Sequence, residues 1–256
     1  MKKSHRDPAT FNLRMIKNRK ETDVCPTRKN CVELWGSEEL FCSIRDLTKF
    51  ELIYKQDELI YKAGDPVTSL YVIQSGAVKL EKEIDGGGNH VNSFYFTGEL
   101  IGSESLGFEQ HQYSAIALKE TWVCEIRLQK LAMLGQSATA ILQKINTLLS
   151  QNLCELDEHH YNNRHLHLEP RLLNFFNVIC KKNLDPVDES FNRLKLPLTK
   201  KDIANYLGMR QESLSRAFRQ LKNKGIVKDS SNKRTIVIDK QKLMDYLGFS
   251  ESKKTG

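Results

Sequence analysis

Apolar residues change their spacing along the chain and so mark three different regions. Between residues 51 and 126, short runs of β-branched and aromatic residues alternate with turn signals such as Gly64-Asp65-Pro66. From residue 137 to 165 there is no glycine or proline, and apolar residues recur at heptad spacing. Beyond Pro170 shorter helical patterns follow. The pattern predicts an α+β chain whose regular strands and turns favour a jelly roll, that is, a β-roll.

The β-rich region is predicted to follow one short helix. Ser37 is a suitable N-cap for a helix that runs to about Lys49. The buried side of this helix would carry Leu40, Phe41, Ile44 and Leu47, and strands are expected at Leu70 to Ile73, Ala77 to Leu80, Val91 to Phe96 and Trp122 to Ile126.

The most informative segment begins at Thr199 and has the pattern of a helix-turn-helix. Thr199 is a good N-cap, apolar residues at 203, 204 and 207 share one side of a short helix, and Gly208 stands where a left-handed residue would end it. A second helix is expected to start near Arg210. Its buried side would carry Leu214, Phe218 and Leu221.

The second helix presents a polar face that suits the reading of base edges. Burial of its apolar side turns Glu212, Ser215 and Arg216 outward together, at positions i, i+3 and i+4. Arginine can hold guanine by two hydrogen bonds, a carboxylate accepts from an exocyclic amine, and serine adapts to either partner. Thr199 and Arg210 flank this face, and we assign them to DNA as well.

A wing is predicted after this helix, because IVKDSSNKRTIVI places two β-rich runs around a polar, basic turn. Lys228, Lys233 and Arg234 would lie beside the backbone of the duplex, and Lys222 and Lys224 could hold phosphates. The alternative is an ordinary amphipathic helix pair with a solvated charged face, and the wing argues against it. The formal net charge of +7 agrees with a phosphate-binding protein.

The heptad stripe predicts a long helix that pairs with a second copy through Leu142, Ile145, Leu149 and Leu156. A long helix packed on its own β domain would need the same stripe. We favour the dimer seam because a two-fold DNA reader needs a partner. The domains are then expected as a basic arm over 1–24, a sensor β-roll over 25–136, a dimerisation helix over 137–168, a winged helix-turn-helix over 169–248 and a tail over 249–256.

Composition narrows the class of protein further. With 256 residues, of which 39% are hydrophobic and 28% charged, the chain has room for two soluble domains. No apolar run approaches the length of a membrane span, and the basic start lacks the apolar core of a secretory signal, so we expect a cytoplasmic protein without a membrane partner. Six cysteines in a cytosolic chain are more often free thiols or metal ligands than disulfides.

The chain resembles the CRP/FNR superfamily of bacterial transcription regulators over nearly its whole length. The run LIYKAGDPVTSLYVIQSGAVKL is similar to the cyclic-nucleotide-binding β-roll of that family, and Glu212, Ser215 and Arg216 match the E-x-x-S-R reading motif of its anaerobic branch. The resemblance implies a homodimer on double-stranded DNA, at a pseudo-palindrome with half-sites similar to TTGAT, and RNA polymerase as a further partner.

The resemblance also allows the nucleotide-binding residues of the family to be compared with the matching residues of this chain. In nucleotide-binding relatives an acidic residue after a glycine binds the ribose, and an Arg-Ser pair binds the phosphate. Here Gly98-Glu99-Leu100 is kept, but the matching pair is Tyr113-Ser114, so the phosphate would meet no cation. Because burying an unpaired anion is unfavourable, we expect no cyclic nucleotide and interpret Glu99 as a structural leftover.

Three cysteines resemble cluster ligands of the oxygen-sensing branch of this family. Cys25 and Cys31 precede the first helix and Cys124 lies within WVCEIR, at the spacing of that branch. Thiolates select iron–sulfur clusters or zinc, and the resemblance implies an oxygen-labile 4Fe–4S cluster. The branch has another cysteine three residues before the position of Cys25, where this chain has Thr22.

The fourth ligand stays open among Cys42, Asp23 and a thiol or water outside the chain. Cys42 follows closely after Cys31, and thiolate is softer than carboxylate, although a lone cysteine on an amphipathic helix is more often part of a core. We expect Cys154 and Cys180 to be packing residues, and the histidines at 159, 160, 165 and 167 to cover a helix surface.

Three function classes remain: a DNA-binding regulator with an iron–sulfur cluster, the same regulator gated by another small effector or by nothing, and an enzyme. The enzyme is the weakest, because the chain shows no catalytic triad, phosphate-binding glycine loop or metal-hydrolase motif. A cupin-like metalloenzyme would need inward-facing His and Glu residues that these strands lack.

Overall fold

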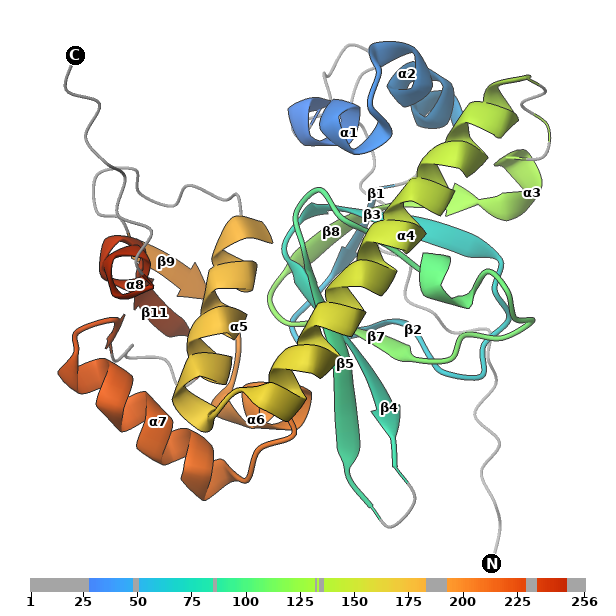
Figure 1. The fold of residues 1–256 in the computed structure, drawn as a ribbon. Coiled ribbons are helices and arrows are strands. Elements are labelled where there is room, and N and C mark those ends of the chain that lie inside the picture. Colours follow the sequence, from blue (N-terminus) through green and yellow to red (C-terminus); the bar gives the residue numbers. More distant parts are fainter. Residues whose placement is uncertain are drawn as a thin grey trace, which may run out of the picture.

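The computed structural model describes residues 28–47, 51–84, 87–131, 133, 136–182, 193–228 and 234–247. A β-roll with two short helices beside it is joined by the long helix α4 to a smaller C-terminal part made mostly of helices (Figure 1). The predicted α+β architecture is therefore confirmed.

The β-roll consists of two four-stranded antiparallel sheets. The four strands predicted from sequence lie within β3, β4, β5 and β8, whereas the four shorter strands were missed. One sheet has the order β1 (Glu51–Tyr54), β8 (Thr121–Arg127), β3 (Ser69–Ser75), β6 (Leu100–Ile101), and the other β2 (Leu59–Tyr61), β7 (Ser114–Ala117), β4 (Ala77–Glu83), β5 (Asn89–Phe96). Buried residues such as Ile73, Val78 and Val123 fill the space between them.

The turn from β3 to β4 shows why a glycine is needed at position 76. Gly76 has a φ of +126°, and a Cβ there would lie 2.4 Å from the Thr121 hydroxyl oxygen on β8. This close approach lets the chain pass from one sheet to the other directly over the start of β8.

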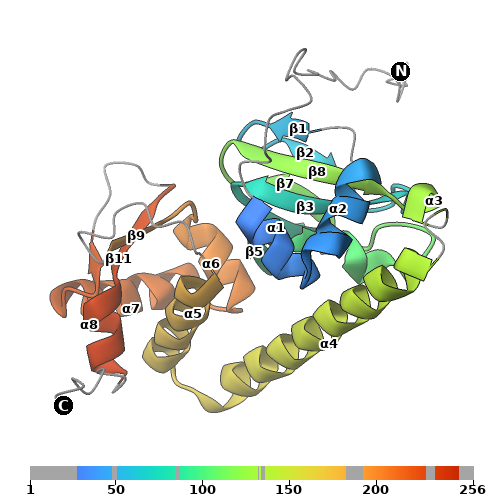
Figure 2. The same cartoon turned by 90° about the horizontal axis from the view of Figure 1, so that it is seen from above.

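Two short helices, α1 (Arg28–Trp35) and α2 (Glu38–Leu47), pack beside the start of α4 (Gln136–His165), as both views show (Figures 1 and 2). The predicted cap of α2 is confirmed, because the Leu40 N–H donates to the Ser37 hydroxyl at 3.1 Å. Helix α1 was not predicted. Together with the short α3 (Leu128–Leu131) these helices enclose an apolar cluster with Trp35, Ile44 and Ile126.

Helix α4 corrects the predicted dimer seam. Ile145 is 2% exposed and lies in the apolar cluster of its own β-roll, so it offers no surface to a partner. Leu149 and Leu156 are half-buried, whereas Leu142 is 54% exposed and Leu153, which the heptad reading passed over, is 68% exposed. One side of the stripe therefore packs on the chain's own β-roll, and pairing with a second copy through the exposed side stays a prediction.

The C-terminal part contains a three-stranded sheet and four helices. The strands pair in the order β10 (Val227–Lys228), β11 (Ile236–Asp239), β9 (Arg193–Leu196), which gives the predicted wing. Pro170 lies within the first turn of α5 rather than before it, where a residue without an N–H is tolerated. The helices are α5 (Leu168–Lys182), α6 (Lys200–Tyr206), α7 (Gln211–Asn223) and α8 (Lys240–Tyr246).

One apolar cluster crosses the boundary between the two halves. Phe94 on β5 packs against Phe175 on α5 at a ring distance of 6.0 Å and against Tyr206 on α6 at 5.3 Å. The predicted division into separate domains stays a prediction, because these halves share a core. Among the described helices, none is both long and apolar enough to cross a membrane.

Candidate nucleic-acid interface and sensor site

Helix α6, the first helix of the helix-turn-helix, begins at a capping box. The Thr199 hydroxyl accepts a hydrogen bond from the Asp202 N–H at 3.0 Å, while the Asp202 carboxylate accepts one from the Thr199 N–H at 3.4 Å. Gly208 follows the helix with a φ of +59°. The start and the end predicted for this helix are confirmed, and they fix the turn that leads into α7.

Helix α7 has the two sides that its sequence predicts. Leu214, Phe218 and Leu221 are at most 5% exposed and belong to the shared core. On the opposite side Glu212, Ser215 and Arg216 are all exposed, as is Arg210 at the N-cap. This side is therefore free to approach another molecule.

Arg219 extends the exposed side by one turn and was missed by the sequence reading. It lies three residues after Arg216, and its side chain is exposed. The i, i+3 spacing that groups the other three residues would have found it. A further guanidinium on this side adds to its suitability for base edges or phosphates.

The lysines and arginine assigned to phosphates are partly engaged within the chain. Lys224 binds the Glu169 carboxylate and donates to the Tyr246 hydroxyl at 2.6 Å, so it ties α7 to α5 and α8. Lys228 lies 3.8 Å from the Asp239 carboxylate on the neighbouring strand β11. Lys222 is exposed.

Arg234, at the end of the wing, is exposed and pairs with a residue of the β-roll. Its guanidinium donates to the Asp57 carboxylate, which lies between β1 and β2, at 2.6 Å. Contact with a phosphate would therefore require that this ion pair open. Lys233 lies outside the described residues.

A second ion pair holds the helix-turn-helix against the β-roll. The Lys79 ammonium on β4 lies 2.9 Å from Asp202, the capping residue of α6, and 2.7 Å from Glu81. Burial opposes its charge, but hydrogen bonds to the two carboxylates outweigh burial and raise the pKa of Lys79. The Asn205 amide on α6 also donates to the Asn89 carbonyl at 2.9 Å.

Glu99, interpreted as a structural leftover, has a specific structural role. Its carboxylate accepts the Phe96 N–H at 2.7 Å and faces the Lys182 ammonium of α5 at 3.2 Å. Lys182 also pairs with Glu155 of α4 at 2.6 Å. Burial opposes the charge of Lys182, but the two carboxylates outweigh it and raise its pKa. The residue that matches a ribose ligand in nucleotide-binding relatives thus joins the two halves of this chain.

The position that matches the phosphate site carries no cation. The Ser114 hydroxyl is occupied by the Ala63 N–H at 3.0 Å, and Tyr113 packs against the core between the sheets. Another carboxylate, Glu104 in the 3-10 helix η1 (Ser103–Ser105), accepts the Tyr61 hydroxyl at 2.8 Å, and burial raises its pKa. The expectation that no cyclic nucleotide binds here stays a prediction.

The cysteines are described only in part. Cys124 on β8 and Cys42 on α2 are half-buried and pack against the same apolar cluster, so these two thiols belong to one region. Cys25 lies outside the described residues, and for Cys31 the structure gives only a place in α1. Within the residues described, no three His, Cys, Asp or Glu side chains are grouped as metal ligands.

The remaining cysteines divide against expectation. Cys180 on α5 is buried, as predicted, but Cys154 on α4 is exposed and is not a packing residue in this chain. Cys154 follows Leu153 on the outer side of α4, so its place on a helix was not enough to predict burial. Of the four histidines near the end of α4, the side chain of His167 is described, and it is exposed.

Two family models match the two halves of the chain. The cyclic nucleotide-binding domain matches residues 51–137, and the Crp-like helix-turn-helix domain matches residues 171–246. The chain belongs to the CRP/FNR superfamily. As a member of this superfamily it is a DNA-binding transcription regulator and not an enzyme.

Several relatives in the CRP/FNR superfamily match almost end to end. The chain is 26% identical to "Anaerobic regulatory protein" of Haemophilus influenzae, over 90% of this chain and 89% of that protein. It is 29% identical to "Electron transport regulator A" of Shewanella oneidensis, over 86% and 87%. It is 25% identical to "Fumarate and nitrate reduction regulatory protein" of Vibrio cholerae, over 90% and 91%.

Solved structures of CRP/FNR proteins share the fold. FixK2 from Bradyrhizobium japonicum is 26% identical, with a TM-score of 0.64 over 76% of this chain and 95% of that one. The c-di-GMP responsive global regulator CLP of Xanthomonas campestris has a TM-score of 0.63 at 19% identity, over 78% and 98%.

Proposed function

We propose that this CRP/FNR protein acts as a homodimer that reads a DNA pseudo-palindrome with half-sites similar to TTGAT. The observation that carries the proposal is the exposed side of α7, where Glu212, Ser215 and Arg216 stand together above a buried apolar side. A two-fold protein matches a two-fold site, with half-sites one helical turn apart. As a regulator of transcription it would meet RNA polymerase, in the cytoplasm.

Binding to a matched pair of DNA duplexes tests the reading face. Arg216→Ala should weaken binding to the TTGAT-like site by about 1–3 kcal/mol and leave binding to random DNA nearly unchanged. Arg127→Ala, which removes the same charge from the end of β8 in the sensor sheet, is the control and should leave site binding intact. Equal loss on both duplexes would contradict the base-reading role.

We also propose that the sensor half carries an oxygen-labile 4Fe–4S cluster held by Cys25, Cys31 and Cys124. The chemistry of the donors supports this, because soft thiolates are the ligands of such clusters and Cys124 is half-buried rather than sealed in a core. Cys42 is the preferred fourth ligand, since it packs in the same cluster as Cys124. Asp23 or an external group is the alternative. When bound, the cluster would supply sensitivity to oxygen.

Iron analysis after anaerobic reconstitution separates these possibilities. The native chain should take up iron and sulfide, and Cys124→Ala should lose both. Cys154→Ala, which removes an exposed thiol on α4, is the matched control and should retain them. Iron retained in Cys42→Ala would assign the fourth ligand to Asp23 or an external group. A native chain that binds no stoichiometric iron would leave a cluster-free regulator.

A further inference from the structure

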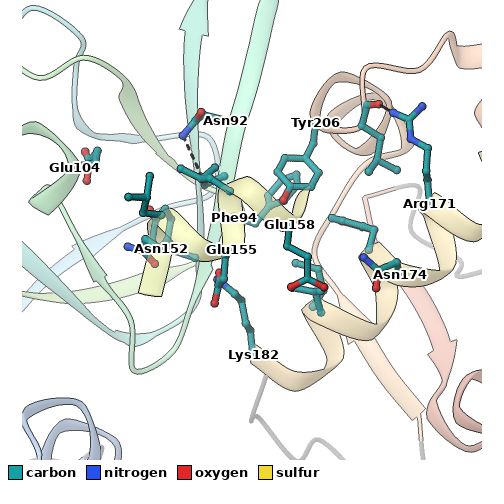
Figure 3. Close-up of a pocket in the computed structure, with 18 of the residues that line it drawn as sticks. Asn92, Phe94, Glu104, Asn152, Glu155, Glu158, Arg171, Asn174, Lys182 and Tyr206 are labelled. Atoms are coloured by element: carbon teal, nitrogen blue, oxygen red, sulfur yellow. Dashed lines mark hydrogen bonds and ion pairs between the residues drawn. The ribbon is translucent and has the colours of Figure 1, made fainter. Parts of the chain in front are cut away.

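A cavity of about 260 Å³ lies between the two halves of the chain (Figure 3). Its walls come from strand β5, the second half of α4, helix α5 and helix α6. It is separate from the half-buried thiols, which pack at the other end of α4 near α2. The volume lies just below the range of drug-sized sites, so it suits a molecule with a single ring.

The cavity has an aromatic wall made by three rings. Tyr206 lies 5.3 Å from Phe94 and 5.4 Å from Phe175, measured between ring centroids. Leu153, Leu156 and Val178 continue the apolar lining. Such a surface favours an apolar or aromatic body, and the ring faces also attract a cation.

The two cations at the cavity are already engaged by the chain. Lys182 is held between Glu99 and Glu155, and the Arg171 guanidinium donates to the Leu207 carbonyl. Neither is therefore available to neutralise an anionic ligand without breaking a contact that joins the two halves.

The carboxylate of Glu158, by contrast, is available. Within the residues described, it makes no hydrogen bond or ion pair, and neither do the amides of Asn152 and Asn174 that line the same cavity. Figure 3 shows Glu158, in the last third of α4, with Asn174 of α5 nearby. The other two carboxylates of the lining are engaged, Glu155 with Lys182 and Glu104 with the Tyr61 hydroxyl, so Glu158 carries the unpaired negative charge among the described lining residues. The charge of the site thus complements a cation and repels a phosphate.

We propose that this cavity binds a small aromatic amine, with its ring against Phe94, Phe175 and Tyr206 and its ammonium group at Glu158. Such a ligand would touch the β-roll, α4 and the helix-turn-helix at once. It would therefore stabilise the arrangement of the two halves described here relative to any other arrangement. This inference depends on neither the cluster nor the DNA sequence read.

Three probes that share one ring test the proposal on the full chain. 2-Phenylethylamine should raise the melting temperature saturably, because a ligand that binds only the folded chain stabilises it by mass action. 2-Phenylethanol should act weakly, and 3-phenylpropionate should not act. A stronger effect of the acid than of the amine would overturn the assignment of charge, and the absence of any shift would overturn the site.

Two variants locate the binding. Glu158→Gln should weaken the amine about tenfold, while Glu83→Gln, which neutralises an exposed carboxylate on β4, should leave it unchanged. Val178→Phe should fill the cavity and abolish binding. Unchanged affinity in Glu158→Gln would refute the proposal even if Val178→Phe fails to fold. Amine binding that disappears as the protein concentration rises would also refute the proposal. Such a result would mean that a second protomer, and not a small ligand, covers the opening of the cavity.

Discussion

His111 is a buried histidine whose ring lies flat on another ring. It is 3% exposed and stacks on Tyr61 with the centroids 3.8 Å apart. Its Nδ1 atom finds no hydrogen-bond partner in the part of the chain that the structure describes. Burial lowers the pKa of His111, although Asp65 opposes the shift. The folded chain thus prefers the neutral ring.

This preference predicts a loss of stability in mild acid. Below the ordinary histidine pKa of about 6.5 the unfolded chain binds a proton that the folded chain resists, so the free energy of unfolding should fall as pH drops toward the lowered pKa. His111→Phe keeps the stacking and should flatten this part of the curve, measured by urea unfolding between pH 7 and 5. His90→Phe, on an exposed histidine, should not. Parallel curves for the native chain and His111→Phe would contradict the prediction.

For single residues, the sequence was sufficient where the role depends on neighbours a few positions away. The cap at Thr199, the turn at Gly208 and the outward group on α7 follow from spacings of three to four residues. It failed for partners far apart in sequence. Lys182 and Glu99 are 83 positions apart, and no local pattern reports that a lysine at the end of a helix neutralises a carboxylate in the turn between β5 and β6.

Helix α4 divides its apolar residues between a buried side and an exposed side. Ile141 and Ile145 face the β-roll, whereas Leu142 and Leu153 face outward. A heptad spacing marks apolar positions but not which of them a neighbouring domain covers, and for that reason Ile145 was misplaced. The shortest elements were harder still, since strands such as β6 and β10, of two residues each, carry no readable period.

The two sides of α4 should respond differently to truncation. Ile145→Ala should lower the free energy of unfolding by about 2–5 kcal/mol, because it leaves a cavity in the sensor core. Leu153→Ala should leave folding nearly intact but raise the dissociation constant of the dimer about tenfold, measured by sedimentation velocity. An unchanged dimer in Leu153→Ala would place the seam elsewhere.

The whole molecule is held together by contacts between its halves. An ion-pair chain links Glu99 of the β-roll, Lys182 of α5 and Glu155 of α4, and a second pair links Lys79 to Asp202. Sequence predicted both halves but not their contact, because the partners lie on segments that only the fold brings together.

Removal of the Lys182 ammonium should destabilise the chain, because Glu99 and Glu155 would then lack a counter-charge. Lys182→Met should lower the free energy of unfolding by about 1–3 kcal/mol, since half-buried Glu99 loses its counter-charge. Adding Glu99→Gln should recover part of that loss in a double-mutant cycle of urea unfolding. If the double variant is as unstable as the sum of the single ones, the lysine acts through packing of its stem alone.

The apolar cluster that crosses from β5 to α5 and α6 also limits how such a protein can be recombined. Consider a chimaera in which the helix-turn-helix part of another regulator replaces that of this chain. Phe94 would then contact side chains that do not match its packing surface, and Lys79 and Asn89 would lose their partners on α6. The hairpin of β4 and β5 would have to travel with the graft. We therefore expect the DNA target to be changed most easily by point substitutions on the exposed side of α7, because these residues make none of the contacts between the two halves.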